Sequence, residues 1–447
     1  MKFIVIYITA LITPTLAQTG CPNGIRTRPN YLTMSQADKD KFHNAVKTIN
    51  TAQGGNLYQN FTATHYTVGS GAHGSPGFFV WHRKFIREFE KALQGVDPSI
   101  MLPYWDWTRD SQAPERSQLF AANNMGGNGG SGSGGCINNG PFAGWRVQSA
   151  NSGCVSRYFG RGTTIPSWTA PEILNSDLNV QQSYDRFRSR IEGTGHALVH
   201  TGIGGNNGDM SFMYSTNDPI FWLHHAFIDL IWYEWQQRNP SRANDYPTNP
   251  ATTRLAIYGV PVSSTFDTRS SEYCYNYPRW TVNAPPVDPT TTPTTTGPAT
   301  TTTTTTVPAT TTTSNPTTTA ATTTTTVPVT TTTRTTTTTG TTTTIAPTPT
   351  PTCPAGILGI IMGCRRSRRA LDVASLLGQV DKFPGFVSSL DRTITGKIRV
   401  PSQVPESFLR MNGLDVATAM NDYLESAIIA CKLNLIPNFR PLAELKL

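Results

Sequence analysis

The segment Asn217-Asp-Pro-Ile-Phe-Trp-Leu-His-His225 decides the fold expected for this chain. A capping side chain followed directly by proline is a strong signal for a helix start, because proline fits the first turn. The helix that follows carries a row of large apolar side chains, namely Leu223, Ile228, Ile231, Trp232 and Trp235. The segment therefore predicts a helix with two adjacent histidines near its start.

Adjacent residues on a helix point about 100° apart, so at most one of the two histidines faces a given metal ion. His225 shares a helix face with Ile228, Asp229 and Trp232, and we take His225 as the metal ligand. His224 is left as a residue that supports the ligands or packs beside them.

Another pair of histidines lies upstream, in His196-Ala-Leu-Val-His200. On a helix, both rings project from one face and are close enough to share a metal ion. The zinc-protease motif has Glu at the second position, where this chain has Ala197, so a zinc protease is disfavoured. The segment ends in Gly202-Ile-Gly-Gly205, which is a clear helix stop.

A further group, His65, His73 and His82, lies earlier in the chain at intervals of eight and nine residues. A single histidine on an apolar helix face, such as His82, is more often a hydrogen-bonded core residue than a ligand. Three histidines at these intervals favour a metal site. His43 competes with His65, but it belongs to an earlier amphipathic helix, and we take it as a packing residue.

Six of the chain's eight histidines thus fit one constellation of two groups of three. Six neutral imidazoles exceed the ligands that one catalytic zinc ion uses. Sites made of imidazole alone suit copper. Two three-histidine copper ions that face each other suit the binding of dioxygen. The aromatic residues around both groups would keep such a site dry and offer a surface to a phenol ring.

The first residues of the chain indicate the location of the protein, and its charge bears on the partners that it binds. Residues 1–17 are a predicted secretory signal, with Lys2, an apolar core over residues 3–12 and a cleavage site at Thr15-Leu-Ala17. No stretch is long and apolar enough for a membrane span. The formal charge of +8 comes with no basic stripe interleaved with aromatic residues, which disfavours nucleic-acid binding. We expect a secreted, soluble, extracellular protein.

Three regions follow the signal. Residues 18–284 have globular composition, and residues 285–352 are almost entirely Thr and Pro, which is typical of an O-glycosylated stalk. Residues 353–447 form a small module of unassigned role. Inside it, Arg366-Ser-Arg-Arg369 resembles a proprotein-convertase site with processing after Arg369, and a solvated basic turn is the equal alternative.

The chain has seven cysteines, which is typical of an oxidising compartment. Four lie before residue 285, and four cysteines allow three connectivities, so spacing does not decide the pairing. We favour Cys136–Cys154 across a glycine-rich loop and Cys21–Cys274 between the ends of the globular region. Asn60-Phe-Thr62 is a glycosylation acceptor, which is a weak signal alone.

These segments resemble the type-3 copper proteins: tyrosinases, catechol oxidases and haemocyanin functional units. The matching segments are His73-Gly-Ser-Pro-Gly-Phe-Phe-Val-Trp-His82-Arg83, Leu102-Pro-Tyr-Trp-Asp-Trp107, His196-x-x-x-His200 with Gly204-Gly205, and the Asn217 to His225 segment followed by Asp229. They cover roughly residues 60–237 in the family's order and spacing. The resemblance implies a mainly α fold, in which a central antiparallel four-helix bundle with long loops holds two copper ions.

The resemblance also implies roles for single residues. It implies six copper ligands: His65, His73 and His82 for the first ion, and His196, His200 and His225 for the second. It implies that Glu192 orients a water able to help deprotonate a phenol, and the alternative is an exposed carboxylate at a helix end. It implies that Phe221 narrows the entrance over the second copper, and the alternative is core packing.

Three positions depart from the family pattern. Ala197 stands where many active tyrosinases have an Asn that helps to hold the proton-accepting water, which puts hydroxylation of monophenols in doubt. Gly71 stands where some members have a Cys that crosslinks to the histidine two residues on, so no thioether forms here. Leu230 replaces a frequent Arg after Asp229, which leaves that carboxylate to pair elsewhere, with Arg83 as the candidate.

The leading function is a secreted dicopper phenol oxidase, a tyrosinase or catechol oxidase. It uses O2 to convert monophenols, o-diphenols or both to o-quinones, for pigment formation or crosslinking of extracellular matrix proteins. The runner-up is a haemocyanin-like oxygen carrier, and the single unit with its stalk and short tail favours the enzyme. A third interpretation is a matrix protein with a metal-structured domain. The C-terminal module is expected to shield the site until it is cleaved.

Overall fold

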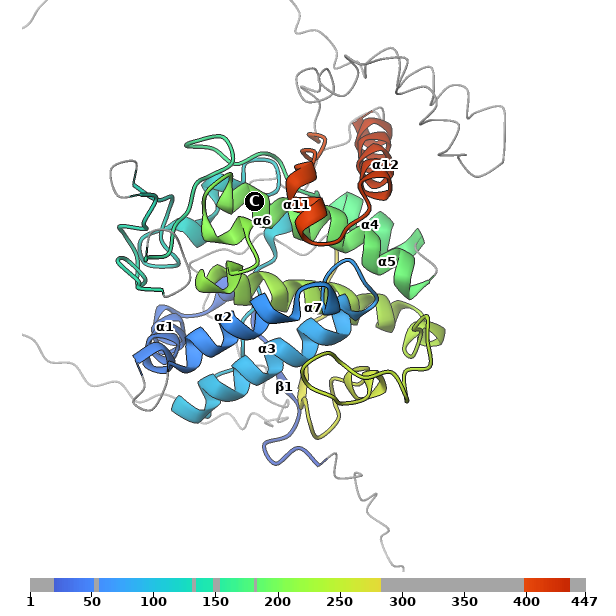
Figure 1. Ribbon diagram of the computed structural model, residues 1–447, viewed down its shortest axis with the longest axis horizontal. Helices are drawn as coiled ribbons and strands as arrows, with labels where there is room; N and C mark the ends of the chain where they lie inside the picture. The colour runs from blue at the N-terminus through green and yellow to red at the C-terminus, as the bar shows by residue number, and fades with distance from the viewer. Residues whose placement is uncertain are drawn as a thin grey trace, which may run out of the picture. The chain divides into compact units, whose positions relative to one another are not determined.

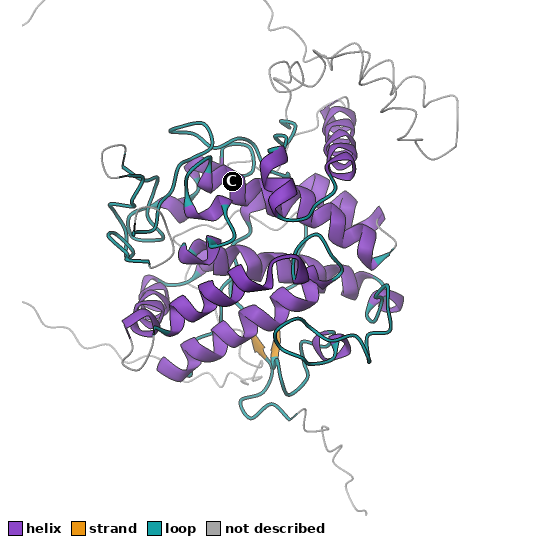
Figure 2. Cartoon of the chain, viewed as in Figure 1, coloured by secondary structure: helices purple, strands orange, loops and turns teal. Residues whose placement is uncertain are grey.

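The computed structural model describes residues 20–51, 56–130, 134–147, 153–180, 183–282 and 398–434. This part of the chain is mainly helical, as predicted, with long loops between the helices (Figure 1, Figure 2). Its α-helices are α1 (Gln36–Thr51), α2 (Leu57–Val68), α3 (Gly77–Val96), α4 (Pro171–Val180), α5 (Tyr184–Ile191), α6 (Ala197–Gly204), α7 (Ile220–Arg238), α11 (Glu406–Met411) and α12 (Val416–Asn434). Short 3-10 turns connect them.

Helix α7 is the helix predicted from the Asn217 to His225 segment. The carboxylate of Asp218 accepts a hydrogen bond from the backbone N–H of Ile220 at 3.0 Å, which caps the first turn. Nearly every side chain of α7 is buried, so the helix runs through the interior. It packs against α3, and α2 and α3 lie beside it in Figure 1.

A buried ion cluster joins α3 to α7. The Asp229 carboxylate of α7 accepts hydrogen bonds from Arg83 Nε of α3 at 2.6 Å and from Arg28 Nη1 at 3.1 Å. The hydroxyls of Tyr275 and Tyr277 donate to the same carboxylate at 2.6 and 2.8 Å. The predicted pairing of Asp229 with Arg83 is therefore confirmed, and Arg28 is a second ion-pair partner of the same carboxylate.

The ends of the globular region lie together. Strands β1 (Arg26–Thr27) and β2 (Tyr275–Asn276) pair in parallel, and the Cys21–Cys274 disulfide lies directly beside this pair. A second disulfide joins Cys136 to Cys154. Both favoured pairings are confirmed.

The C-terminal helices α11 and α12 pack on the segment from α4 to α6, although they are far from it in sequence (Figure 1). Arg190 of α5 is fully buried and donates to the Ser426 hydroxyl of α12 at 2.9 Å. The Ser167 hydroxyl donates to the backbone carbonyl of Val400 at 2.8 Å. Residues 398–434, part of the predicted C-terminal module, therefore fold onto the domain that carries the histidines.

Several sequence predictions lie outside the described residues: the signal in residues 1–17, the Thr/Pro stretch in residues 285–352 and the basic motif that ends at Arg369. Within the described ranges, no helix has both the length and the apolar character that a membrane crossing requires.

Candidate metal centre

His65 of α2, His73 of the following loop and His82 of α3 form the first triad. Their ring centroids lie 4.9 to 5.6 Å apart. In all three, Nδ1 lies within hydrogen-bond distance of a backbone carbonyl, at 2.7, 3.0 and 2.8 Å in that order. Such a bond keeps the proton on Nδ1 and leaves Nε2 as a metal ligand. The Nε2 atoms of His65 and His82 lie 3.5 Å apart.

His196, His200 and His225 form the second triad, with ring centroids 4.5 to 5.5 Å apart. His196 ends a π-helical turn, Glu192–His196, and His200 lies one turn further on in α6. Nδ1 of His196 lies 3.2 Å from the carbonyl of Glu192, and Nδ1 of His200 lies 2.7 Å from that of Met210. The Nε2 atoms of His200 and His225 are 3.3 Å apart.

The two triads face each other along a line of ring contacts, here called the seam, which is formed by His82, His225, Phe78 and His196. The rings of His82 and His225 stack at 4.4 Å with an interplanar angle of 19°. Phe78 bridges the seam, with its ring centroid 4.9 Å from His82 and 4.8 Å from His196. Residues up to 160 positions apart in sequence thus meet at one point.

Burial makes all six imidazoles neutral. None of the six side chains is more than 3% exposed. Burial in low-dielectric surroundings disfavours the charged ring, and it lowers the pKa of His73 to about 4 and that of His200 to about 3. The pKa values of the other four are also lowered, first by burial and then by neighbouring histidines. The neutral ring is the form that binds a metal ion.

The donor set fits copper. Nε2 of His196 is buried without a hydrogen-bond partner in the described part of the chain, which is costly unless another atom binds it. The residues of each triad place one ligand atom apiece within 4.8 Å of one another, and His224 belongs to the same group as the second triad. Three neutral imidazoles at each of two adjacent points, without cysteine, suit a dinuclear copper centre.

Phe221 lies in the interior, between the triads. It stacks on His225 at 4.0 Å and meets the ring edges of His65 at 5.0 Å and His200 at 6.0 Å. Its side chain is fully buried. Phe221 therefore contacts histidines of both triads.

Glu192 is fully buried, so the alternative of an exposed carboxylate is wrong. One carboxylate oxygen accepts the backbone N–H of Gly74 at 2.8 Å, and the other accepts from Arg188 at 3.0 Å. Burial raises the pKa of Glu192 to about 7, although the charge of Arg188 opposes this shift. Since Gly74 follows His73, Glu192 links the π-helical turn that ends at His196 to the first triad.

Two further histidines lie near or beyond the triads. His43 is on α1, where its Nε2 lies 2.8 Å from the Tyr31 hydroxyl, and it belongs to neither triad. His224 lies against the second triad, 5.4 Å from His196 and 5.0 Å from His200 between ring centroids. The sequence offered only its adjacency to His225 as a clue to this position.

The C-terminal segment covers the triads. Phe408 and Asn412 line a cavity of about 10 Å³ together with four of the six histidines, His65, His73, His196 and His200. The Phe408 ring lies 5.9 Å from that of His200. Sequence reasoning did not find Phe408, because no local pattern marks a contact across more than 200 residues.

The same segment touches the backbone beside His73. A Cβ atom on Gly74 would lie 2.3 Å from the carbonyl oxygen of Gly413, so only glycine permits this approach. The contact joins the C-terminal segment to the loop that carries a ligand of the first triad.

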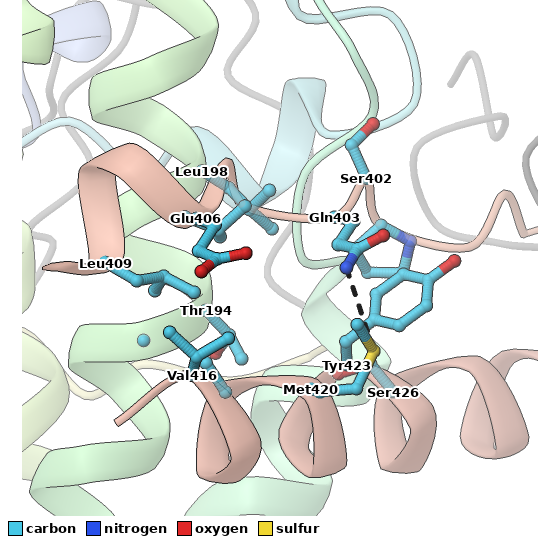
Figure 3. Close-up of a pocket in the computed structure, with 14 residues that line it drawn as sticks. Thr194, Leu198, Ser402, Gln403, Glu406, Leu409, Val416, Met420, Tyr423 and Ser426 are labelled. Atoms are coloured by element: carbon cyan, nitrogen blue, oxygen red, sulfur yellow. Dashed lines mark hydrogen bonds between the residues drawn. The ribbon is translucent and has the colours of Figure 1, made fainter. Parts of the chain in front are cut away.

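A larger pocket of about 80 Å³ lies between the C-terminal helices and the π-helical turn (Figure 3). Gly193, Thr194 and Leu198 form one wall, and residues of α11, α12 and the segment before them form the other. Leu409 and Val416 point into it from the C-terminal side in Figure 3. The C-terminal segment therefore leaves a gap over part of this turn.

Sequence comparison identifies relatives of this chain. Residues 55–238 match the common central domain of tyrosinase. The chain is 35% identical over 237 residues to a tyrosinase of Streptomyces glaucescens, which covers 48% of this chain and 83% of the relative. It is 32% identical over 281 residues to grixazone synthase of Streptomyces griseus, which covers 51% of this chain and 89% of the relative.

Solved structures of related proteins are also similar. A polyphenol oxidase from Thermothelomyces thermophila matches with 23% identity and a TM-score of 0.45, over 57% of this chain and 90% of that one. An octopus hemocyanin functional unit matches with 20% identity and a TM-score of 0.45, over 56% of this chain and 68% of that one. The sequence identity over most of the length of the bacterial relatives establishes the family. The chain belongs to the tyrosinase family of copper oxidoreductases.

Proposed function

We propose that this protein is a secreted phenol oxidase that uses O2 to convert monophenols, o-diphenols or both to o-quinones. The observation that supports this most directly is the pair of facing histidine triads, all buried and neutral. Phenols as substrates are supported by relatives named tyrosinase, such as that of Streptomyces antibioticus, which is 36% identical over 84% of its length.

In this proposal, six histidines hold two copper ions: His65, His73 and His82 bind one, and His196, His200 and His225 bind the other. When bound, the two ions supply the binding of dioxygen and its activation toward an aromatic ring. The protein keeps the rings neutral and excludes water from them. Phe78 and Phe221 contribute to this exclusion, since each contacts histidines of both triads.

Glu192 is proposed to orient a water that receives the proton of a phenol. A pKa of about 7 matches proton exchange near neutral pH, where a general base is most effective. Gly74 and Arg188 hold the carboxylate in one orientation. Ala197, beside His196, offers this water no polar side-chain atom, so hydroxylation of monophenols depends more heavily on Glu192.

Oxygen uptake by the copper-loaded protein tests the proposal, with a monophenol and, separately, the matching o-diphenol. Uptake with both identifies a tyrosinase. Uptake with the diphenol alone identifies a catechol oxidase and makes Ala197 the residue to substitute. No uptake with either, when elemental analysis confirms the copper and the C-terminal segment has been removed, would overturn the enzyme and favour the carrier or matrix function.

An oxygen carrier is the second candidate, and one observation favours it: Phe408 and Asn412 line the small cavity over four of the six histidines. A carrier needs a site that oxygen reaches and a phenol does not. Spectroscopic titration with O2, repeated after removal of the C-terminal segment, distinguishes the two functions. Reversible binding without phenol consumption in both forms would support the carrier.

We also propose that residues 353–447 shield the site until the chain is cut after Arg369. The place of Phe408, 5.9 Å from His200 between ring centroids, supports this. Limited proteolysis followed by an oxygen-uptake assay tests it. Uptake should rise after cleavage, and equal rates before and after would count against shielding.

Secretion, the O-glycosylated stalk and N-glycosylation at Asn60 remain proposals from the sequence. Asn60 is exposed on α2, as a glycosylated residue must be. Expression in a eukaryotic host and the mass of the product in the medium test all three. The proposed biological use is pigment formation or crosslinking of extracellular matrix proteins, to which the o-quinones would couple.

A further inference from the structure

His224 lies beside the second triad, and the proposed function leaves it without a role. It is fully buried on α7, directly before His225. Its ring stacks on His196 at 5.4 Å with an interplanar angle of 17°. The same ring meets His200 nearly at a right angle, 77°, at 5.0 Å. It therefore contacts two members of the triad at once, one in a stacked and one in a nearly perpendicular arrangement.

Hydrogen bonds do not explain these contacts. Both ring nitrogens of His224 are buried without a hydrogen-bond partner in the described residues. The backbone carbonyl of His196 lies nearby, but it does not meet the geometry of a hydrogen bond. What remains is the packing of flat rings, which prefer offset-stacked and edge-to-face arrangements at these separations.

The backbone holds His196 less closely than four of the other ligands, and Nδ1 of His225 has no partner within the described residues. The Nδ1 contact of His196 with a backbone carbonyl is 3.2 Å long, whereas those of His65, His73, His82 and His200 are 3.0 Å or shorter. His196 also sits at the junction between the π-helical turn and α6. A weaker hydrogen bond leaves the ring freer to rotate, and a rotated ring withdraws its Nε2 from the metal.

Trp107 lies near His224 and beside the backbone that precedes His196. Its ring lies 6.2 Å from that of His224, and a Cβ atom on Gly195 would lie 2.7 Å from its Cη2 atom. Gly195 directly precedes His196, so Trp107 limits the backbone there while His224 limits the ring. Together, Trp107 and His224 restrict the rotation of the His196 ring.

We propose that His224 is a positioning residue that fixes the ring orientation of His196, and with it the geometry of the second copper, by ring packing and not through its nitrogens. This rests on the proposed function, because it assumes that His196 binds copper. A flat ring without nitrogens at position 224 should hold the ring of His196 in place, whereas a branched aliphatic side chain should not.

The test compares His224→Phe with His224→Leu in the full chain, and uses His43→Leu as a matched control. His43 is also a buried histidine on a helix, but it lies outside both triads. Copper content is measured by elemental analysis, and the release of copper to an excess of chelator is followed over time. Oxygen uptake with an o-diphenol is measured in parallel, with kcat and KM separated.

For His224→Leu we expect one of the two copper equivalents to leave about 10-fold faster, which is the lower range for loss of a group that orients a metal ligand. His224→Phe and His43→Leu should release copper at the rate of the unsubstituted protein. If the Leu variant does not fold, His224→Ala takes its place, since it also removes the ring.

Two results would overturn the inference. Rapid copper loss from both position-224 variants would mean that a nitrogen of His224 binds the metal. Release from His224→Leu at the rate of His43→Leu would mean that the ring of His196 is held by other contacts. Failure of the proposed function looks different, because the unsubstituted protein itself would then not bind two copper ions.

Discussion

The two halves of the metal centre are held in different ways. In the first triad, a hydrogen bond of 3.0 Å or less joins Nδ1 of each ring to a backbone carbonyl. In the second, only His200 has such a bond, while His196 has one of 3.2 Å and Nδ1 of His225 has none within the described residues. Phe221 stacks on His225 instead, and His224 stacks on His196. Backbone hydrogen bonds thus orient the first triad, and aromatic packing contributes most to the second.

The largest expected effect comes from breaking the seam between the halves. His82→Ala removes a ligand of the first triad and the ring on which His225 stacks. We expect the first copper ion to be lost and oxygen uptake to fall below detection, because both ions are needed to bind dioxygen between them. Elemental analysis and an oxygen electrode measure the two effects. His43→Ala is the control, and two retained copper ions in His82→Ala would contradict the assignment.

Acid should destabilise both halves of the metal-free protein. Burial lowers the pKa of His73 to about 4 and that of His200 to about 3, while an unfolded histidine titrates near 6.5. The unfolded state therefore binds more protons, so stability is complete above pH 6.5 and is lost as the pH falls toward 4. Each such histidine contributes a loss of up to about 1.4 kcal/mol per pH unit.

Urea unfolding of the metal-free protein at a series of pH values measures this loss. Several buried histidines add their contributions, so the effect should be several times that of one group. A free energy of unfolding that stays constant between pH 7 and pH 5 would show that the triads are already open to water without copper.

The next largest effect is expected from the ion cluster of Asp229, Arg83 and Arg28. Asp229→Ala leaves Arg83 with an uncompensated buried charge and weakens the pairing of Arg28, which keeps Glu90 at 2.8 Å. Because this ion cluster joins the helices that carry His82 and His225, we expect a loss of about 3–5 kcal/mol in the free energy of unfolding. The exposed Asp38–Lys41 pair is the control, and Asp38→Ala should cost about 1 kcal/mol or less. Equal losses in the two variants would refute a structural role for the cluster.

The smallest expected effect concerns the link between the halves at Glu192. Glu192→Gln keeps an acceptor for the N–H of Gly74, but it removes the group that takes up a proton. Oxygen uptake with a monophenol should slow by about 10²-fold, the lower range for loss of a general base. Uptake with the matching o-diphenol is the internal control and should fall less. Equal losses with both substrates would assign Glu192 to structure alone.

Local patterns in the sequence account for much of this protein. The capping residues before α7, the glycine stop after α6 and the apolar stripe of α3 predict those helices, because caps and periodic burial depend on near neighbours. The π-helical turn before His196 and the burial of Glu192 were not predictable. The burial of Glu192 involves the loop at Gly74, which reaches the carboxylate only in the folded chain, whereas Arg188 is a near neighbour four residues earlier.

The number and spacing of the histidines were enough to indicate two copper ions. Ligand chemistry depends on side-chain identity, and few residues other than histidine suit such a site. The stacking of His82 on His225, the stacking of His224 on His196 and the cover formed by Phe408 were decided only by tertiary structure. These are contacts between surfaces of elements far apart in the chain. Their geometry follows from how whole helices pack, and no short stretch of sequence contains that information.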